Sequence, residues 1–288
     1  MMNILKIVSV MAAMFLLGCT TPNTPEKEKT TLPAITKEDT HKYYSGKFVW
    51  HDLLTDDVAS AKKFYGTLFG WTFEDNENYT LIKHNEKPIG GMMKVTDSTK
   101  NNVEALWLPS MSVSNVDSAI TYVKRNDGKV LKGPLDMKER GRGVLVSDAQ
   151  GAHLVLLHTK SGDPIDATPQ MGDWLWNELW TDESVKSYNF YRHLGQYDRS
   201  KEKDNYRILK TKGKWRAGIR HIKDEKISAH WIPVVRVTDP KAVTAKVASL
   251  GGKVLFEAND SLYDGNVAVI VDSSGALLIV QRWTKGQK

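Results

Sequence analysis

One pattern of residue types occurs twice in this chain. Residues 50–65 read WHDLLTDDVASAKKFY, and residues 176–191 read WNELWTDESVKSYNFY. Three shorter matches follow in the same order, at 107–109 and 231–233, 128–131 and 252–255, and 148–151 and 272–275. An internal repeat of this length indicates a duplicated folding unit, because each copy of a repeat forms the same local structure.

The repeat predicts two tandem domains, which we place at residues 47–160 and 173–285. The segment 161–172 between them is rich in Gly, Pro and Asp, a composition typical of a linker. A chain of 288 residues accommodates two domains of ordinary size.

Each copy has the pattern of a strand, a helix and further strands. Apolar and aromatic residues at 48–54 predict a strand. An apolar face recurs at helical spacing over 58–68, and Gly70 is a typical helix end. Two strands are expected at 79–83 and 88–95, and the pattern then restarts. We therefore predict an α+β fold of four βαβββ units, two in each domain.

The N-terminus differs from the rest of the chain. Residues 7–18 form an apolar run that is too short to span a bilayer and has the length of a signal-peptide core. It leads into Leu16-Leu17-Gly18-Cys19, which resembles the lipobox of bacterial lipoproteins. The resemblance implies removal of residues 1–18 and acylation of Cys19, with palmitate among the acyl groups. An ordinary signal peptide and a short membrane anchor are the alternatives.

The lipoprotein resemblance predicts a location and a partner. Acylation of Cys19 would anchor the protein to a membrane of the cell envelope, and Thr20 is typical of outer-membrane lipoproteins facing the periplasm in Gram-negative hosts. Residues 19–46 are dominated by Thr, Pro, Lys and Glu, so we predict a flexible tether there. Cys19 is the only cysteine, which excludes thiol chemistry once it is acylated. The net charge of +6 is spread along the chain, so no nucleic-acid partner is expected.

The strand–helix opening over Thr55–Trp71 and the Asp-x-x-Gly turns resemble the vicinal oxygen chelate superfamily, which contains glyoxalase I, extradiol dioxygenases and bleomycin-resistance proteins. The resemblance covers both copies and is nearest to a two-domain, glyoxalase-like subgroup. It implies that two βαβββ units in each domain form a curved mixed sheet around a cavity. Fold alone does not determine the chemistry.

Many members of this superfamily bind a divalent metal at fixed strand positions. Carried onto this chain, those positions are all apolar, so no metal cofactor is expected. The six positions are Trp50, Leu108 and Val155 in the first copy, and Trp176, Ile232 and Ile279 in the second. A register slip of one residue would bring in His51 or Asn177, so a divalent metal stays open as an alternative.

Two carboxylates share the expected cavity side of the opening strands. Asp52 and Glu178 alternate with Trp50 and Trp176, so they face the same way. Each is a candidate catalytic base, and the alternative is a structural role in the repeat. His51 faces the other way, where we expect the sheet exterior or the contact between copies.

Four tryptophans are candidate ligand-binding residues: Trp50, Trp107, Trp176 and Trp231. For Trp107 and Trp231, packing in the core is the alternative. The leading hypothesis is an envelope lipoprotein that binds a small, partly apolar molecule without metal. One alternative is a lyase or isomerase of glyoxalase type, assisted by metal or using Asp52 or Glu178 as base. Another is an envelope interaction protein whose cavities are filled by its own side chains.

Overall fold

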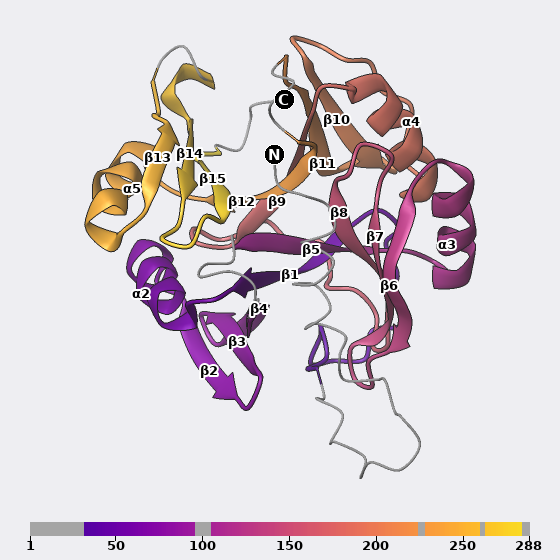
Figure 1. Ribbon diagram of the computed structural model, residues 1–288, viewed down its shortest axis with the longest axis horizontal. Coiled ribbons are helices and arrows are strands. Elements are labelled where there is room, and N and C mark those ends of the chain that lie inside the picture. Colours follow the sequence, from indigo (N-terminus) through magenta and orange to yellow (C-terminus); the bar gives the residue numbers. More distant parts are fainter. Residues whose placement is uncertain (1–31, 96–104, 224–227, 260–262, 284–288) are drawn as a thin grey trace.

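The computed structural model describes residues 32–95, 105–223, 228–259 and 263–283. The predicted signal peptide and Cys19 lie outside these residues. Within the described part of the chain, no helix is both long and apolar enough to cross a membrane. The elements form two mixed sheets, one from each copy of the repeat (Figure 1).

The first sheet has eight strands in the order β2-β3-β4-β1-β5-β8-β7-β6. Its elements are β1 (Phe48–Thr55), α2 (Val58–Phe69), β2 (Thr72–Asn76), β3 (Tyr79–His84), β4 (Lys87–Lys94), β5 (Leu106–Ser112), α3 (Val116–Arg125), β6 (Lys129–Asp136), β7 (Gly141–Ser147) and β8 (His153–Thr159).

The second sheet has seven strands in the order β10-β11-β9-β12-β15-β14-β13. Its elements are β9 (Trp174–Thr181), α4 (Ser184–Leu194), β10 (Tyr206–Thr211), β11 (Lys214–His221), β12 (His230–Arg236), α5 (Pro240–Val247), η2 (Ala248–Leu250), β13 (Lys253–Phe256), η3 (Tyr263–Gly265), β14 (Val267–Val271) and β15 (Leu277–Gln281).

The opening strand of each copy lies at the centre of its sheet. Strand β1 runs parallel to β4 and antiparallel to β5, so that Asp52 pairs with Gly91 on one side and Leu108 on the other. Strand β9 repeats this arrangement, with Glu178 between Gly218 and Ile232. The predicted α+β fold with two tandem mixed sheets is confirmed.

The prediction of three strands after every helix is wrong for one unit. The second sheet has no equivalent of β2, because residues 195–205 form a loop in which the one β-bridge to the sheet joins Lys203 and Tyr206. This stretch reads GQYDRSKEKDN and lacks the alternation of apolar residues that would cover one face of a strand. The loop therefore replaces an edge strand.

The helices pack between the two copies. Helix α2 shares an apolar cluster with α5, and α3 and α4 share another with β11, so each core contains residues of both domains. Figure 1 shows α2 beside α5 on one side of the molecule, and α3 and α4 together on the other. We call the sheet side that packs on the helices the helix face, and the side that carries Trp50 or Trp176 the cavity face.

The prediction of a flexible tether is wrong for residues 32–46. These residues pack on the first domain, where Leu32 and Ile35 are each only 6% exposed and join the apolar cluster on the cavity face. The N–H of Thr40 donates to the carbonyl of Ser161 at 2.8 Å. Burial of these two apolar side chains favours the packed position, because it removes surface that would otherwise contact water.

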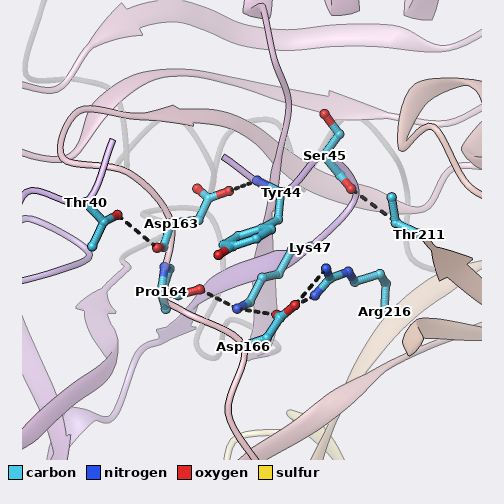
Figure 2. Close-up of polar contacts among 9 residues, drawn as sticks. All are labelled: Thr40, Tyr44, Ser45, Lys47, Asp163, Pro164, Asp166, Thr211 and Arg216. Carbon is cyan, nitrogen blue, oxygen red and sulfur yellow. Dashed lines mark hydrogen bonds and ion pairs between the residues drawn. The ribbon is translucent and has the colours of Figure 1, made fainter. Parts of the chain in front are cut away.

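The same segment is clamped to the linker and to the second domain (Figure 2). The Lys47 ammonium donates to Asp166 at 2.9 Å, and the Arg216 guanidinium donates to both oxygens of that carboxylate at 2.6 and 3.0 Å. The N–H of Tyr44 donates to Asp163 at 2.7 Å. The linker therefore fixes the start of the first domain against strand β11.

Candidate functional site

In the first domain, the candidate base Asp52 is fully engaged within the protein. It accepts hydrogen bonds from Trp50 Nε1 at 3.1 Å and from the Tyr79 hydroxyl at 2.7 Å. Its other oxygen accepts from Arg140 at 3.1 Å, and the guanidinium also lies 4.7 Å from the Trp50 ring. A buried ion pair is tolerated when all its hydrogen bonds are made. These contacts give Asp52 a structural position.

The cavity face of the first sheet is covered by the chain itself. Leu32 and Ile35 pack there with Leu135 and Met137, and Trp50 is only 1% exposed. The carbonyl of Pro33 accepts a hydrogen bond from Arg140 at 3.3 Å, which seals the polar centre. In this domain, the space where a ligand is expected is filled.

In the second domain, Glu178 occupies the place of Asp52 but has different partners. One of its oxygens accepts from Trp180 Nε1 at 2.8 Å and from Arg220 at 2.5 Å. The Arg220 guanidinium lies 4.7 Å from the Tyr206 ring. Burial raises the pKa of Tyr206 well above its usual value, and the negative charge of Glu178 adds to the shift.

The two sites share a tyrosine that lies over a glycine. A Cβ atom added to Gly91 would lie 1.9 Å from the Tyr79 hydroxyl, and one added to Gly218 would lie 1.8 Å from the Tyr206 hydroxyl. Each glycine is paired with the carboxylate residue of its domain. The absent side chain makes room for the hydroxyl, so a tyrosine, a glycine and a carboxylate form one repeated unit.

The candidate residues Trp50 and Trp176 differ in their hydrogen bonds. Trp50 Nε1 is bonded to Asp52 and to Tyr79, as described above, whereas Trp176 Nε1 is buried and has no hydrogen-bond partner among the described residues. The ring of Trp215 stacks on Trp176 with 5.6 Å between centroids and is 36% exposed. The second domain therefore presents an aromatic surface where the first is closed.

Two other tryptophans require a correction. Trp107 and Trp231 do not line the cavities, because both lie on the helix face. Trp107 Nε1 donates to the Tyr65 hydroxyl at 3.0 Å, and Trp231 Nε1 donates to the Tyr191 hydroxyl at 2.9 Å. Each is 4% exposed and packs in a core shared by the two domains.

A cavity of about 650 Å³ that was not expected from the sequence lies beside the second site. Its wall is the loop that replaces the missing edge strand, and its floor is formed by residues of β10 and β11 on the cavity face. The lining residues are Asp198, Arg199, Ser200, Lys201, Lys203, Asp204, Tyr206, Ile208, Lys210 and Arg220. No motif marked this loop, because its signal is the absence of a strand pattern.

A family model described as bleomycin resistance protein-like N-terminal matches residues 47–85. CFP32 of Mycobacterium bovis, a protein named as a glyoxylase, is 28% identical over 249 residues, which are 83% of this chain and 95% of CFP32. The anthracycline biosynthesis protein DauV of Streptomyces sp. strain C5 is 24% identical over 255 residues, which are 82% of this chain and 92% of DauV.

Solved structures show the same fold. The Mn(II)-bound glyoxalase of Novosphingobium aromaticivorans matches with a TM-score of 0.55 at 11% identity, over 83% of each chain. A variant of homoprotocatechuate 2,3-dioxygenase from Brevibacterium fuscum matches with a TM-score of 0.56 at 12% identity, over 87% of this chain and 74% of that one. The bleomycin-resistance-like match, the relative named as a glyoxylase and the shared fold all support the resemblance to the vicinal oxygen chelate superfamily.

In each domain, the three residues at the superfamily's metal-binding positions lie close together, but their side chains have no atoms that bind a metal. Trp50, Leu108 and Val155 pack in one cluster on the first cavity face. Trp176, Ile232 and Ile279 do so on the second. In the described part of the chain, no three His, Cys, Asp or Glu side chains are close enough to hold a metal. Apolar side chains cannot coordinate a divalent ion, so these residues do not fit the metal of the Mn(II)-bound glyoxalase.

The alternative register does not supply ligands either. His51 Nε2 lies 3.1 Å from Asn177 Oδ1, and the two residues occupy the same position in the two copies. Both point to the helix face, so the expected contact between copies is found there. Burial lowers the pKa of His51 to about 3, although the hydrogen bond that its Nε2 makes to Asn177 Oδ1 acts in the opposite direction.

Proposed function

We propose that the chain is a metal-free binding protein for a small, partly apolar molecule, with its site in the second domain. The observation that carries the proposal is the difference between the two copies. The first cavity face is filled by Leu32 and Ile35, whereas the second lies beside a cavity of about 650 Å³. Ligand sites in proteins have volumes of this order, roughly 300–1,000 Å³.

The residues around the second site suit such a ligand. Trp176 and Trp215 form a stacked pair on the cavity face, and the exposed ring offers an apolar surface. A buried N–H without a partner is costly, so an acceptor that reached Trp176 would gain a hydrogen bond that the protein lacks. The names of the relatives refer to a glyoxylase and to anthracycline biosynthesis, which share small-molecule chemistry but not a reaction.

A neutral fluorescent probe, N-phenyl-1-naphthylamine, tests this proposal on the full chain. We expect saturable binding, and loss of binding in Ile208→Trp, because the larger side chain fills the floor of the cavity. Leu255→Trp is the matched control, since Leu255 is 50% exposed and lies outside the cavity lining. Absence of saturable binding would refute the proposal. A stoichiometric divalent ion in the purified protein would refute its metal-free part.

The rival function is an enzyme, a lyase or isomerase that uses a carboxylate as base. The observation in its favour is that Glu178 is hydrogen-bonded to Arg220, a residue of the cavity lining. The Tyr206 hydroxyl is also hydrogen-bonded to Glu178, so a base at this position would exchange that bond for one to the substrate. Turnover of an aldehyde adduct that is lost in Glu178→Gln would favour this function. Asp52→Asn is the comparison, since Asp52 lies in the filled cavity.

We further propose that the protein is lipidated at Cys19 and held at a membrane of the cell envelope, facing the periplasm in a Gram-negative host. Residues 32–46 pack on the first domain, so only residues 20–31 separate Cys19 from the packed chain. At no more than about 3.5 Å per residue, they would keep the domains within roughly 45 Å of the acyl groups. Mass spectrometry of the mature N-terminus tests this, and Cys19→Ser should release the protein from membranes.

A further inference from the structure

The loop at 195–205, which forms the wall of the cavity, is held in place by hydrogen bonds. The guanidinium of Arg207 donates to the carbonyl of Ser200 at 2.6 Å, and the N–H of Ser200 donates to the Tyr188 hydroxyl at 2.9 Å. The N–H of Asp198 donates to the carbonyl of Lys210 at 2.7 Å. These bonds tie the loop to α4 and β10, so the cavity does not depend on a ligand to form.

The cavity lining carries an excess of positive charge. It contains five basic residues and only two acidic ones, Asp198 and Asp204. Asp198 already accepts a hydrogen bond from the N–H of Gly213 at 3.1 Å. Arg220 is balanced by Glu178, and Lys210 lies 5.4 Å from the Trp215 ring. The other basic residues, Arg199, Lys201 and Lys203, make no ion pair with any acidic side chain in the described ranges.

The floor of the same cavity is less polar. Tyr206 and Ile208 are half-buried on the cavity face, next to the Lys210 stem. Arg199, Lys201 and Lys203 are exposed and lie at the rim, whereas the less polar surface of Tyr206 and Ile208 is below them. This arrangement matches a molecule with an apolar body and one anionic group, because each part meets a surface of complementary character.

The first domain provides an internal comparison. At the corresponding edge it has strand β2, whose acidic residues Glu74 and Asp75 are paired with Lys83 and Lys62. The cationic rim lies on the loop of the second copy, at the edge where the first copy has β2.

We infer that the second site takes an anionic amphiphile: a small molecule with an aromatic or aliphatic body and a carboxylate, sulfonate or phosphate group that binds the rim of Arg199, Lys201 and Lys203. This inference rests on the proposed function and adds the charge class of the ligand. Attraction between exposed charges is screened by salt, so affinity for the anion should fall as ionic strength rises.

Two fluorescent probes with the same aromatic body separate charge from shape. 8-Anilinonaphthalene-1-sulfonate carries a sulfonate, and N-phenyl-1-naphthylamine does not. On the full chain, we expect the sulfonate to bind at least tenfold more tightly, and to lose at least fivefold in affinity between 0.05 and 0.5 M NaCl. Lys201→Glu/Lys203→Glu should weaken the sulfonate at least tenfold and leave the neutral probe within twofold.

Lys124→Glu/Lys129→Glu is the matched control, because it changes the net charge equally on exposed positions of the first domain. If both probes bind alike and ignore the rim variant, the anionic class is wrong and the proposed function stands. If neither probe binds, both fail. Binding of the sulfonate that survives Ile208→Trp would place it elsewhere and overturn the inference.

An anionic group is also found on lipid head groups, and competition separates the two sources. Displacement of the bound sulfonate probe by soluble naphthalene-2-sulfonate supports a small-molecule ligand. Displacement only by vesicles containing phosphatidylglycerol, and not by the soluble acid, would show that the rim contacts a membrane surface and would overturn the inference.

Discussion

The Tyr65 hydroxyl donates a hydrogen bond to the Asp272 carboxylate at 2.8 Å, and so joins a helix of the first domain to a turn of the second. The Tyr191 hydroxyl interacts with Asp148 in the reciprocal position, but Asp148 Oδ2 makes no hydrogen bond of good geometry with the described residues. The two domains therefore exchange the same contact in both directions. Together with cores that contain residues of both copies, this makes the duplicated chain one unit.

Removing the Tyr65 hydroxyl should destabilise the protein more than removing that of Tyr191. Tyr65→Phe leaves Trp107 Nε1 and one Asp272 oxygen without their partner, whereas Tyr191→Phe leaves only Trp231 Nε1. Each unsatisfied buried group costs about 1–3 kcal/mol. Urea denaturation followed by tryptophan fluorescence measures the difference, and a single transition should persist in both variants. Equal losses, or two separate transitions, would contradict the interdomain account.

Two buried groups should oppose each other in the pH dependence of stability. Burial raises the pKa of Asp148 to about 6, so the folded state binds a proton more readily than the unfolded one, and stability falls as pH rises from about 4 to 6. Burial lowers the pKa of His51 to about 3, so the unfolded state binds the proton, and stability falls as pH drops from about 6.5 towards 3.

Single substitutions should reveal these opposed slopes. In Asp148→Asn the free energy of unfolding should rise with pH between about 4 and 6, and in His51→Gln it should fall over the same range. Each slope approaches about 1.4 kcal/mol per pH unit for one proton. Urea titrations at half-unit pH steps provide the comparison. Parallel pH profiles for the two variants and the parent would show that neither group titrates as described.

The fold could be predicted from the sequence because its determinants are local and occur twice. The helical spacing over 58–68 and Gly70 predict α2, and in the structure Gly70 is left-handed at φ 72° where the helix ends. The helix begins at Asp57, which accepts from the N–H of Ser60 at 3.0 Å. The alternation that placed Asp52 beside Trp50 also holds, because period two is built into a strand.

The site could not be predicted in the same way, because its partners come from distant positions. Arg140 reaches Asp52 from a turn 88 residues later, and no spacing rule connects them. Trp107 was a candidate ligand-binding residue from the repeat, but it packs on α2, because which face of a strand is buried against helices depends on tertiary packing. Leu32 was assigned to a tether because Thr, Pro, Lys and Glu dominate the stretch around it.

Removing the apolar contacts of the N-terminal segment should open the first cavity. Leu32→Ser/Ile35→Ser deletes the two buried side chains, at a cost of about 2–5 kcal/mol for the pair if the rest of the segment detaches. The exposed cavity should then add a second, weaker site for N-phenyl-1-naphthylamine. Ile165→Ser is the control, since Ile165 is 58% exposed. An unchanged stoichiometry of one would show that the first cavity stays closed without the segment.

Loss of charge at the two equivalent carboxylates should have unequal effects on stability. Asp52→Asn leaves the Arg140 guanidinium buried without its counter-charge, and Asp52 and Arg140 have side chains only 2% exposed. Breaking a buried pair in this way costs about 3–5 kcal/mol. Glu178→Gln should cost less, because the Arg220 side chain is 17% exposed and lines an open cavity where water can solvate it. Urea denaturation of the two variants gives the free energies of unfolding to compare. A larger loss of stability in Glu178→Gln would make the second carboxylate the structural one. The candidate site would then move back to the first domain.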